Sequence, residues 1–175
     1  MLRVADLLNT GRMTDPIRPT DDEARALAQS LLSSARFTAL AVQDPETGAP
    51  YVSRIALSAG QGAAVSLVSA LAYHTQALRA DPACALLVGE PGQKGDALAH
   101  PRLTVQARAA FIPRPSDQHE KMAAQYLRDH PKAKLYLSLG DFSFVRFEPV
   151  RAFLNGGFGR AFHLRAGDLI PAAGA

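Results

Sequence analysis

The residues that could bind an anion lie on two neighbouring segments of the chain. Residues 67–81 read LVSALAYHTQALRAD and run from a short apolar stretch into the start of a helix. Ser69, His74 and Thr75 surround this junction, where a helix N-terminus presents free N–H groups and partial positive charge. Arg54 lies one hairpin upstream, and a guanidinium can bind a phosphate through two parallel hydrogen bonds. Together these residues predict a phosphate-binding site.

The segment that carries the arginine has the alternation of a strand. In residues 51–58, YVSRIALS, a period of two places Arg54, Ala56 and Ser58 on one face, opposite the larger apolar side chains. Small neighbours leave room for a ligand beside the guanidinium. Taken singly, Arg54 is better explained as a surface arginine on a half-exposed strand, and Thr75 is consistent with a plain helix N-cap. The combination with the serine and histidine of the next segment favours a shared anion site.

The elements that must position these residues follow from periodicity and turn residues. Thr20-Asp21-Asp22-Glu23 reads as a capping box, with Thr20 as N-cap of a helix that runs to about Ala35. Strands are expected at 37–42, 51–58, 64–69, 83–89, 102–112, 142–147, 149–154 and 161–164, and further helices at 75–79, 116–128 and 132–139. Hairpin-linked strands with flanking helices predict a mainly β fold of α+β character, built as an antiparallel barrel.

Length and composition limit the organisation and the partners. The chain has 175 residues, 47% hydrophobic and 20% charged, which suits one compact domain. We expect an N-terminal arm at 1–19, the domain at 20–165 and a C-terminal tail at 166–175. The net charge is +3, but Lys and Arg do not cluster, which argues against nucleic acid. No apolar run predicts a membrane span or signal peptide, and the single cysteine suits a reducing, cytoplasmic setting.

Several other chemistries lack their motifs. The five histidines show no HExxH or paired metal spacing, and Cys84 has no zinc-binding partners. The glycine-rich turn at 155–160 lacks the Lys-Ser/Thr of a phosphate loop, so its glycines are better explained by positive φ angles. Ser53 and Ser69 lack a nucleophile elbow, which excludes a hydrolase triad of that type.

The ordered set of motifs resembles the pyridoxamine 5'-phosphate oxidase-like, FMN-binding split-barrel superfamily. More narrowly, it is similar to the branch that includes heme-utilisation proteins. The resemblance spans roughly residues 20–165, and the motifs that carry it are Ser53-Arg54-Ile55, residues 67–75, Asp81-Pro82, residues 86–92, residues 101–105 and residues 156–161.

This resemblance implies a homodimer with two FMN sites at the subunit interface. The residues it places at the cofactor are Arg54, Ser69, His74, Thr75, Arg79, Arg102 and Thr104. Arg79 is the basic residue nearest to the position where the oxidases carry a phosphate-binding lysine. Arg102 lies near the position of their flavin-contacting glutamine, and Thr104 shares its strand. The implied function is an FMN-dependent oxidoreductase, in which the flavin supplies the redox chemistry and no side chain stands out as catalytic acid or base.

Two further functions remain open on the same scaffold. The chain has no tryptophan, whereas the oxidases bind their substrate through a Trp- and Arg-containing motif, so pyridoxamine phosphate is not the expected substrate. The heme branch implies a heme-binding or heme-degrading protein in which His163 is the iron ligand, and a neutral imidazole is a normal axial ligand. Asp129 or Asp141, in the same chain or across the dimer, is expected to hold its other ring nitrogen. A flavin-binding module without turnover is the third possibility.

Overall fold

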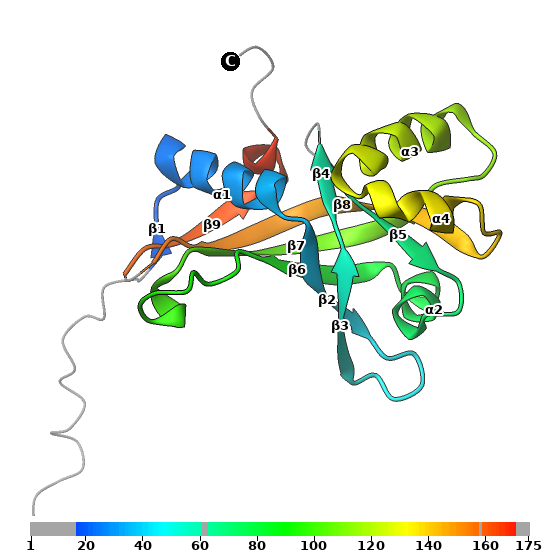
Figure 1. Ribbon diagram of the computed structural model, residues 1–175. Coiled ribbons are helices and arrows are strands. Elements are labelled where there is room, and N and C mark those ends of the chain that lie inside the picture. Colours follow the sequence, from blue (N-terminus) through cyan, green and yellow to red (C-terminus); the bar gives the residue numbers. More distant parts are fainter. Residues whose placement is uncertain (1–16, 61–62, 158, 171–175) are drawn as a thin grey trace, which may run out of the picture.

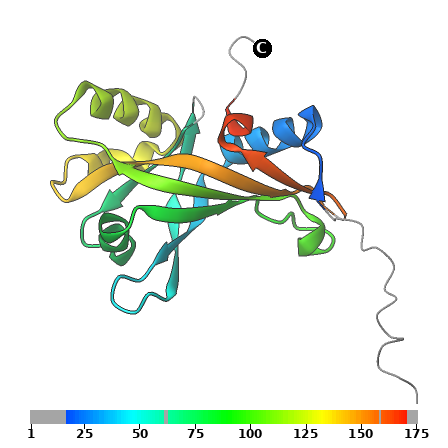
Figure 2. The ribbon, with the colours of Figure 1, turned by 180° about the vertical axis from the view of Figure 1, so that it is seen from behind.

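The computed structural model describes residues 17–60, 63–157 and 159–170, and its ribbon is shown in Figure 1 and, from behind, in Figure 2. In chain order the main elements are β1 (Ile17–Arg18), α1 (Asp22–Ser34), β2 (Phe37–Gln43), β3 (Pro50–Ala56), β4 (Ser58–Gly60), β5 (Ala63–Ser69), α2 (Tyr73–Ala80), β6 (Ala83–Val88), β7 (Arg102–Phe111), α3 (Asp117–Asp129), α4 (Lys134–Leu137), β8 (Phe142–Asn155) and β9 (Ala161–Arg165).

One nine-stranded sheet forms the body of the molecule. Its main path runs β1-β9-β8-β7-β6-β2-β3, and β5 joins it by pairing with both β4 and β8. All described pairs are antiparallel except β1 with β9. The first half of β8 pairs with β5 and its second half with β9, while β7 follows it along the other edge. This change of partner makes the barrel split, so the expected mainly β split-barrel fold is confirmed.

A bulge marks the point where β8 changes partner. Its register with β7 shifts between Gln106 and Ala107, where Pro149 is the residue opposite Ala107. Proline has no N–H to donate to a ladder, and bulges accommodate it while increasing the local twist. The long strand therefore runs from the β5 side of the barrel to the β9 side, as the orange ribbon in Figure 2 shows.

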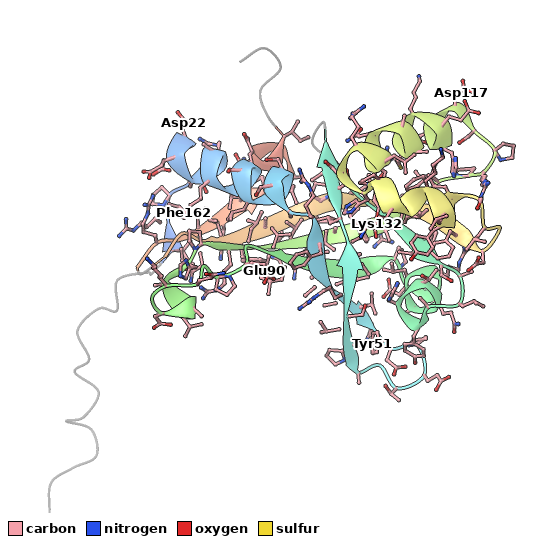
Figure 3. The ribbon with its side chains drawn as sticks, in the orientation of Figure 1. Asp22, Tyr51, Glu90, Asp117, Lys132 and Phe162 are labelled. Carbon is pink, nitrogen blue, oxygen red and sulfur yellow. The ribbon has the colours of Figure 1, made fainter. Side chains whose placement is uncertain are left out.

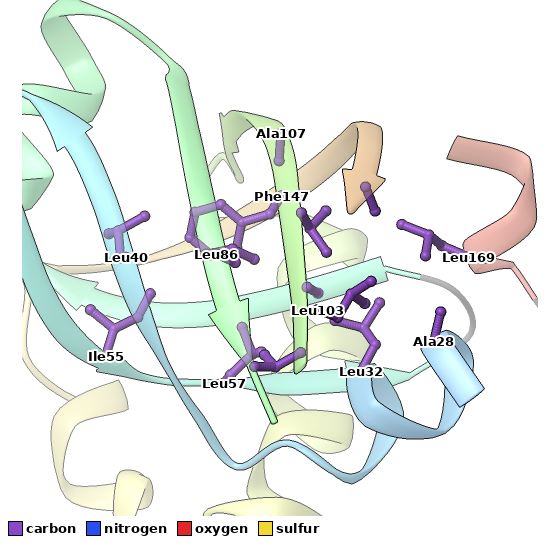
Figure 4. Close-up of a cluster of buried hydrophobic side chains, with 14 of the residues drawn as sticks. Ala28, Leu32, Leu40, Ile55, Leu57, Leu86, Leu103, Ala107, Phe147 and Leu169 are labelled. Atoms are coloured by element: carbon purple, nitrogen blue, oxygen red, sulfur yellow. The ribbon is translucent and has the colours of Figure 1, made fainter. Parts of the chain in front are cut away.

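The core fills the space between the two sides of the split barrel. Leu40, Leu86 and Leu103, from three successive strands of the sheet, are fully buried, and Leu32 of α1 closes the cluster at one end (Figure 4). Each such burial contributes about 2 kcal/mol. At the other end of the sheet, α3 and α4 cover a second cluster around Phe144 (Figure 1). One face of the sheet is thus buried, which leaves its opposite face for other uses.

Two expectations for the local structure are wrong. The N-cap of α1 is Asp21, whose side chain accepts a hydrogen bond from Ala24 N–H. Thr20 instead donates to the carbonyl of His163 at 2.7 Å. The expected strand at 51–58 is interrupted, so Ser58 does not share the exposed face of Arg54. It is buried in β4 and donates to Asp129 Oδ2 at 2.6 Å.

Other boundaries differ only slightly from expectation. The two segments expected at 142–147 and 149–154 are one strand, because the bulge absorbs Pro149 without ending it. Ser116 caps α3 as expected, and its hydroxyl oxygen accepts a hydrogen bond from His119 N–H at 3.1 Å. Ile17 and Arg18, placed in the arm by the sequence, form β1 beside β9. Residues 1–16 and 171–175 lie outside the described residues, so the division of the chain into three parts stays a prediction.

Gly89 follows β6 directly and lies against the backbone at the start of β7, so a substitution at this position tests how closely the two segments pack. Its φ of +99° is unfavourable for any side chain, and an added Cβ would lie 2.5 Å from the carbonyl oxygen of Pro101. We expect Gly89→Ala to lower the free energy of unfolding by about 2 kcal/mol or more, measured by urea denaturation. The control is Gly140→Ala, where an added Cβ meets no atom within 4 Å. Equal midpoints for the two variants would contradict this account of the junction.

Candidate functional site

The exposed face of the sheet carries one continuous row of paired residues. Adjacent strands place Arg54, Ala39, Leu87, Thr104, Phe153 and His163 directly opposite one another. Directly paired residues of an antiparallel sheet point to the same side. We call this set the His163 row. Five strand spacings of about 4.8 Å separate its ends by roughly 24 Å. Figure 3 labels Tyr51 of β3 and Phe162 of β9, the two strands at the ends of this row, and the two residues lie well apart in the view.

His163 lies at one end of this row, above a shallow hollow. Its ring meets the ring of Phe153 edge to face, with centroids 5.0 Å apart. The side chain is exposed, and in the described part of the chain neither of its ring nitrogens has a hydrogen-bond partner. The hollow has a volume of about 220 Å³ and is lined by Ile17, Arg102, Thr104, Phe153, Leu154, Asn155, Ala161, Phe162 and His163.

Three of the residues singled out from the sequence therefore come together here. Arg102, Thr104 and His163 line one hollow, although the first two were assigned to flavin and the third to heme. The guanidinium of Arg102 donates to the carbonyl of Leu98 at 3.0 Å, so part of its hydrogen-bonding capacity holds the loop before β7. The backbone of His163 is fixed by the hydrogen bond from Thr20, which ties β9 to the segment before α1.

A second group gathers where α2 begins. A hydrogen bond of 3.1 Å joins Ser53 Oγ of β3 to His74 Nδ1. The helix starts at Tyr73 and has no side-chain cap, so Thr75 lies inside its first turn and is not the N-cap. Thr75 is fully buried and its hydroxyl has no partner among the described residues. Ser69 is engaged elsewhere, because it donates to Asp141 Oδ2 at 2.7 Å.

The two expected phosphate-binding arginines do not join this group within one chain. Arg54 lies on the exposed face, 5.4 Å from the ring centroid of Phe37. Its neighbour Ser53 points to the opposite side of β3, toward His74. Arg79 lies in the last turn of α2, with its guanidinium 4.4 Å from the ring centroid of Phe111. Any anion site at the start of α2 is therefore built from hydroxyls, the imidazole and backbone N–H groups.

The surroundings of α2 shift the pKa values of two side chains in its first turn. Burial lowers the pKa of His74 below its ordinary value of 6.5. The hydrogen bond from the Tyr73 hydroxyl to Asp44 Oδ1, at 2.8 Å, raises the pKa of Tyr73 to about 12. The same bond ties the helix start to the turn between β2 and β3. The first turn of α2 is thus held in place, with a neutral imidazole facing the serine of β3.

The carboxylates expected to support His163 are used elsewhere in the same chain. Asp129 accepts from Ser58 and lies 3.4 Å from a guanidinium nitrogen of Arg36. Asp141 accepts from Ser69 and precedes β8, whereas the partner of His163 on that strand, Phe153, is twelve residues farther along. At about 3.3 Å per residue that is roughly 40 Å. Within one chain neither carboxylate can orient His163.

The sequence did not single out two side chains that belong to the hollow and its rim. Phe153 contacts the ring of His163, and Arg151 lies over Phe153 with its guanidinium 5.2 Å from the ring centroid. Their alternation along β8, Arg-x-Phe-x-Asn at 151–155, was visible as a possible exposed face. Only the register of β8 with β9 shows that these two side chains lie beside His163.

The single cysteine has the environment of a packing residue. Cys84 is half-buried, and burial raises the pKa of its thiol to about 12.

Two kinds of site are absent from the part of the chain that the structure describes. It holds no group of three histidine, cysteine or carboxylate side chains that could bind a metal ion. Its helices are also too short or too polar to cross a membrane.

Comparisons with known proteins agree with this architecture. The family model for pyridoxamine 5'-phosphate oxidase matches residues 24–156. The chain is similar to the non-canonical heme oxygenase HOZ of Arabidopsis thaliana chloroplasts, 39% identical over 88 residues, which cover 50% of this chain and 26% of that protein. The chain thus spans about a quarter of that curated relative.

Two solved structures resemble most of the chain. One is 46% identical, with a TM-score of 0.78, and covers 87% of this chain and 99% of its own. A heme binding protein from Mycobacterium smegmatis is 27% identical, with a TM-score of 0.77, over 87% of this chain and 61% of its own.

The lowered pKa of His74 gives a pH-dependent contribution to stability. Because the folded pKa lies below the unfolded value, the neutral ring stabilises the fold fully above the unfolded pKa, and this contribution is lost as pH falls through the folded pKa. We expect the wild type to lose more free energy of unfolding between pH 7.5 and pH 5 than His74→Gln does, by urea denaturation at each pH. Parallel pH profiles would contradict the burial of a neutral imidazole.

Proposed function

Because the chain belongs to the pyridoxamine 5'-phosphate oxidase family, and proteins similar to it are named a heme oxygenase and a heme binding protein, we propose that it binds heme on its exposed sheet face. His163 is the proposed axial ligand of the iron. The observation that carries the proposal is the exposed imidazole of His163, with both ring nitrogens free within the described residues, at the edge of a hollow.

The chemistry around His163 fits a porphyrin. A neutral imidazole is a common axial ligand of heme iron. The ring of Phe153 lies beside it, and the His163 row continues through the small or apolar residues Thr104, Leu87 and Ala39. These side chains form a low, largely apolar platform on which a flat ring can lie. When bound, the heme supplies the iron chemistry, and the chain supplies the ligand and the platform.

The size of the hollow supports a second copy of the chain as part of the site. At about 220 Å³ it is smaller than the 300–1,000 Å³ typical of pockets that enclose organic ligands, so a porphyrin would project from it. Large apolar side chains stay exposed on the same face, with Val52 at 62% and Leu87 at 45% exposure. We propose that a homodimer covers this face, and that a carboxylate unable to reach His163 within one chain could reach it from the second.

FMN is the second candidate ligand, at the start of α2. The observation that favours it is the buried hydroxyl of Thr75, which has no partner among the described residues, in the first turn of a helix beside His74. An anion there would accept from backbone N–H groups and from this hydroxyl. Because Arg54 and Arg79 lie elsewhere within one chain, the fit to a flavin phosphate is weaker than the fit of His163 to heme. An oxidoreductase activity depends on this second site.

If the proposed homodimer forms, the mass of the protein in solution is twice that of one chain. We expect sedimentation equilibrium at micromolar concentration to give twice the chain mass of 18.6 kDa. We also expect Val52→Asp to shift the particle toward a single chain, because an unpaired carboxylate cannot be buried at an interface without a large cost. An exposed position away from this face, Leu135→Asp, serves as control. A wild type that sediments as one chain would remove the dimer.

The two candidate sites predict opposite effects from one pair of variants. His163→Ala should remove the sharp Soret band of added hemin and weaken its binding at least about tenfold, because the iron loses its ligand. It should leave FMN binding unchanged. Thr75→Val, close in shape, should lower FMN affinity by about 2 kcal/mol, the scale of a hydrogen bond to a charged group. It should leave the Soret band intact. Absorbance titrations with hemin and fluorescence titrations with FMN measure the two affinities.

The outcomes separate the two proposals. A Soret band unchanged in His163→Ala removes that residue as ligand. FMN affinity unchanged in Thr75→Val removes the flavin site at α2. Turnover is then tested by adding a reductant to the hemin-loaded protein and following the loss of the Soret band, with His163→Ala as the inactive comparison.

A further inference from the structure

We propose that Arg151 binds a carboxylate of the ligand held at His163, an inference that rests on the proposed heme-binding function. The ligand class is a flat aromatic ring with carboxylates at its edge, as in a porphyrin that bears propionates. The argument comes from the position of Arg151 on the exposed face, from the two contacts that fix its guanidinium, and from the charge of the surrounding residues.

Arg151 of β8 is a diagonal neighbour of His163 of β9. On β8 it is two residues before Phe153, whose partner on β9 is His163, and its own partner is Arg165. Its side chain therefore points to the same exposed face. Diagonal neighbours of this kind lie roughly 7–8 Å apart. A ring centred on the imidazole of His163 would bring an edge substituent within reach of the arginine.

Two contacts fix the guanidinium and leave its terminal groups free. The Nε–H of Arg151 donates to Gln106 Oε1 at 2.6 Å. The guanidinium also lies over the ring of Phe153, at 5.2 Å from the centroid. In the described part of the chain no carboxylate or carbonyl accepts from its two terminal nitrogens. Those nitrogens form a planar fork that suits a carboxylate. Phe153 contacts both this cation and the imidazole, so all three side chains are positioned together.

The charge of the exposed face favours an anionic ligand. The row next to the His163 row is made of the paired residues Val52, Ala41, Ala85, Gln106, Arg151 and Arg165. Neither row contains an acidic residue. Arg165 lies beside a carboxylate of its own, since its backbone N–H donates to Asp168 Oδ2 at 2.7 Å. Arg151 has no such neighbour in its row and is therefore the cation assigned to the ligand.

The test compares hemin with its dimethyl ester, which has the same iron and ring but no free carboxylates. Each is titrated into the purified full chain and followed by the Soret band. We expect the wild type to bind hemin about tenfold or more tightly than the ester. Arg151→Ala should weaken hemin binding about tenfold and abolish the preference, with the Soret position unchanged because His163 is intact. Arg151→Lys should restore part of the preference.

The matched control is another arginine on the same face. Arg108 lies on β7, two residues after Gln106, and its side chain is exposed. Its strand neighbour on β8 is Glu148, whereas the hydrogen bond to Gln106 and the stacking on Phe153 belong to Arg151. Arg108→Ala removes the same charge and should keep the preference for hemin. This control separates a bound carboxylate from a general effect of net charge.

The positioning role of Gln106 has its own readout. Gln106→Leu should lower hemin affinity in the wild-type background and have no effect in the Arg151→Ala background, because the amide acts only through the arginine. Equal losses in both backgrounds would overturn that role. An undiminished preference for hemin in Arg151→Ala, with a normal Soret band, would overturn the carboxylate site while leaving heme binding intact. If neither ring gave a Soret band that depends on His163, the proposed function itself would fail.

Discussion

The pairing of β8 with three strands is the constraint on which the rest of the structure depends. Along one edge it pairs with β7, and along the other it pairs first with β5 and then with β9. The bulge opposite Pro149 lets one strand serve both sides without losing its ladder. Moving this register by one residue would turn every side chain beyond it to the other face. Phe153 and Arg151 would then enter the core, and the partner of His163 would change.

This constraint also explains why the two candidate sites are separate. The row that contains His163 ends at Arg54, about five strands away, while the start of α2 lies on the other side of β3. In a pleated sheet, side chains that point to the buried face cannot reach a site on the exposed face. Within one chain, the proposed iron ligand and the candidate anion site at α2 are therefore independent, and each can be changed without the other. A scaffold of this kind can carry different chemistries on its two faces.

The sequence was sufficient for the class of fold and for most elements, because alternation and turn residues are local signals. It placed Arg102, Thr104 and His163 on strands, but their meeting in one hollow depends on register across β7, β8 and β9. That register is set by the bulge and the turns, which no local pattern shows. Ser58 illustrates the same limit: the strand bends at Leu57, so a residue expected beside Arg54 is buried against Asp129. The hydroxyl of Thr75, which has no partner among the described residues, likewise results from burial that a sequence does not reveal.

The most direct measurement of the central claim is a crystal structure of the full chain with hemin, using the anomalous scattering of iron to locate the metal. The account predicts a single iron peak per chain at bonding distance from His163 Nε2, above the ring edge of Phe153, with the porphyrin lying along the exposed sheet face. An iron peak at another histidine, at the start of α2, or on the surface with no protein ligand would contradict it.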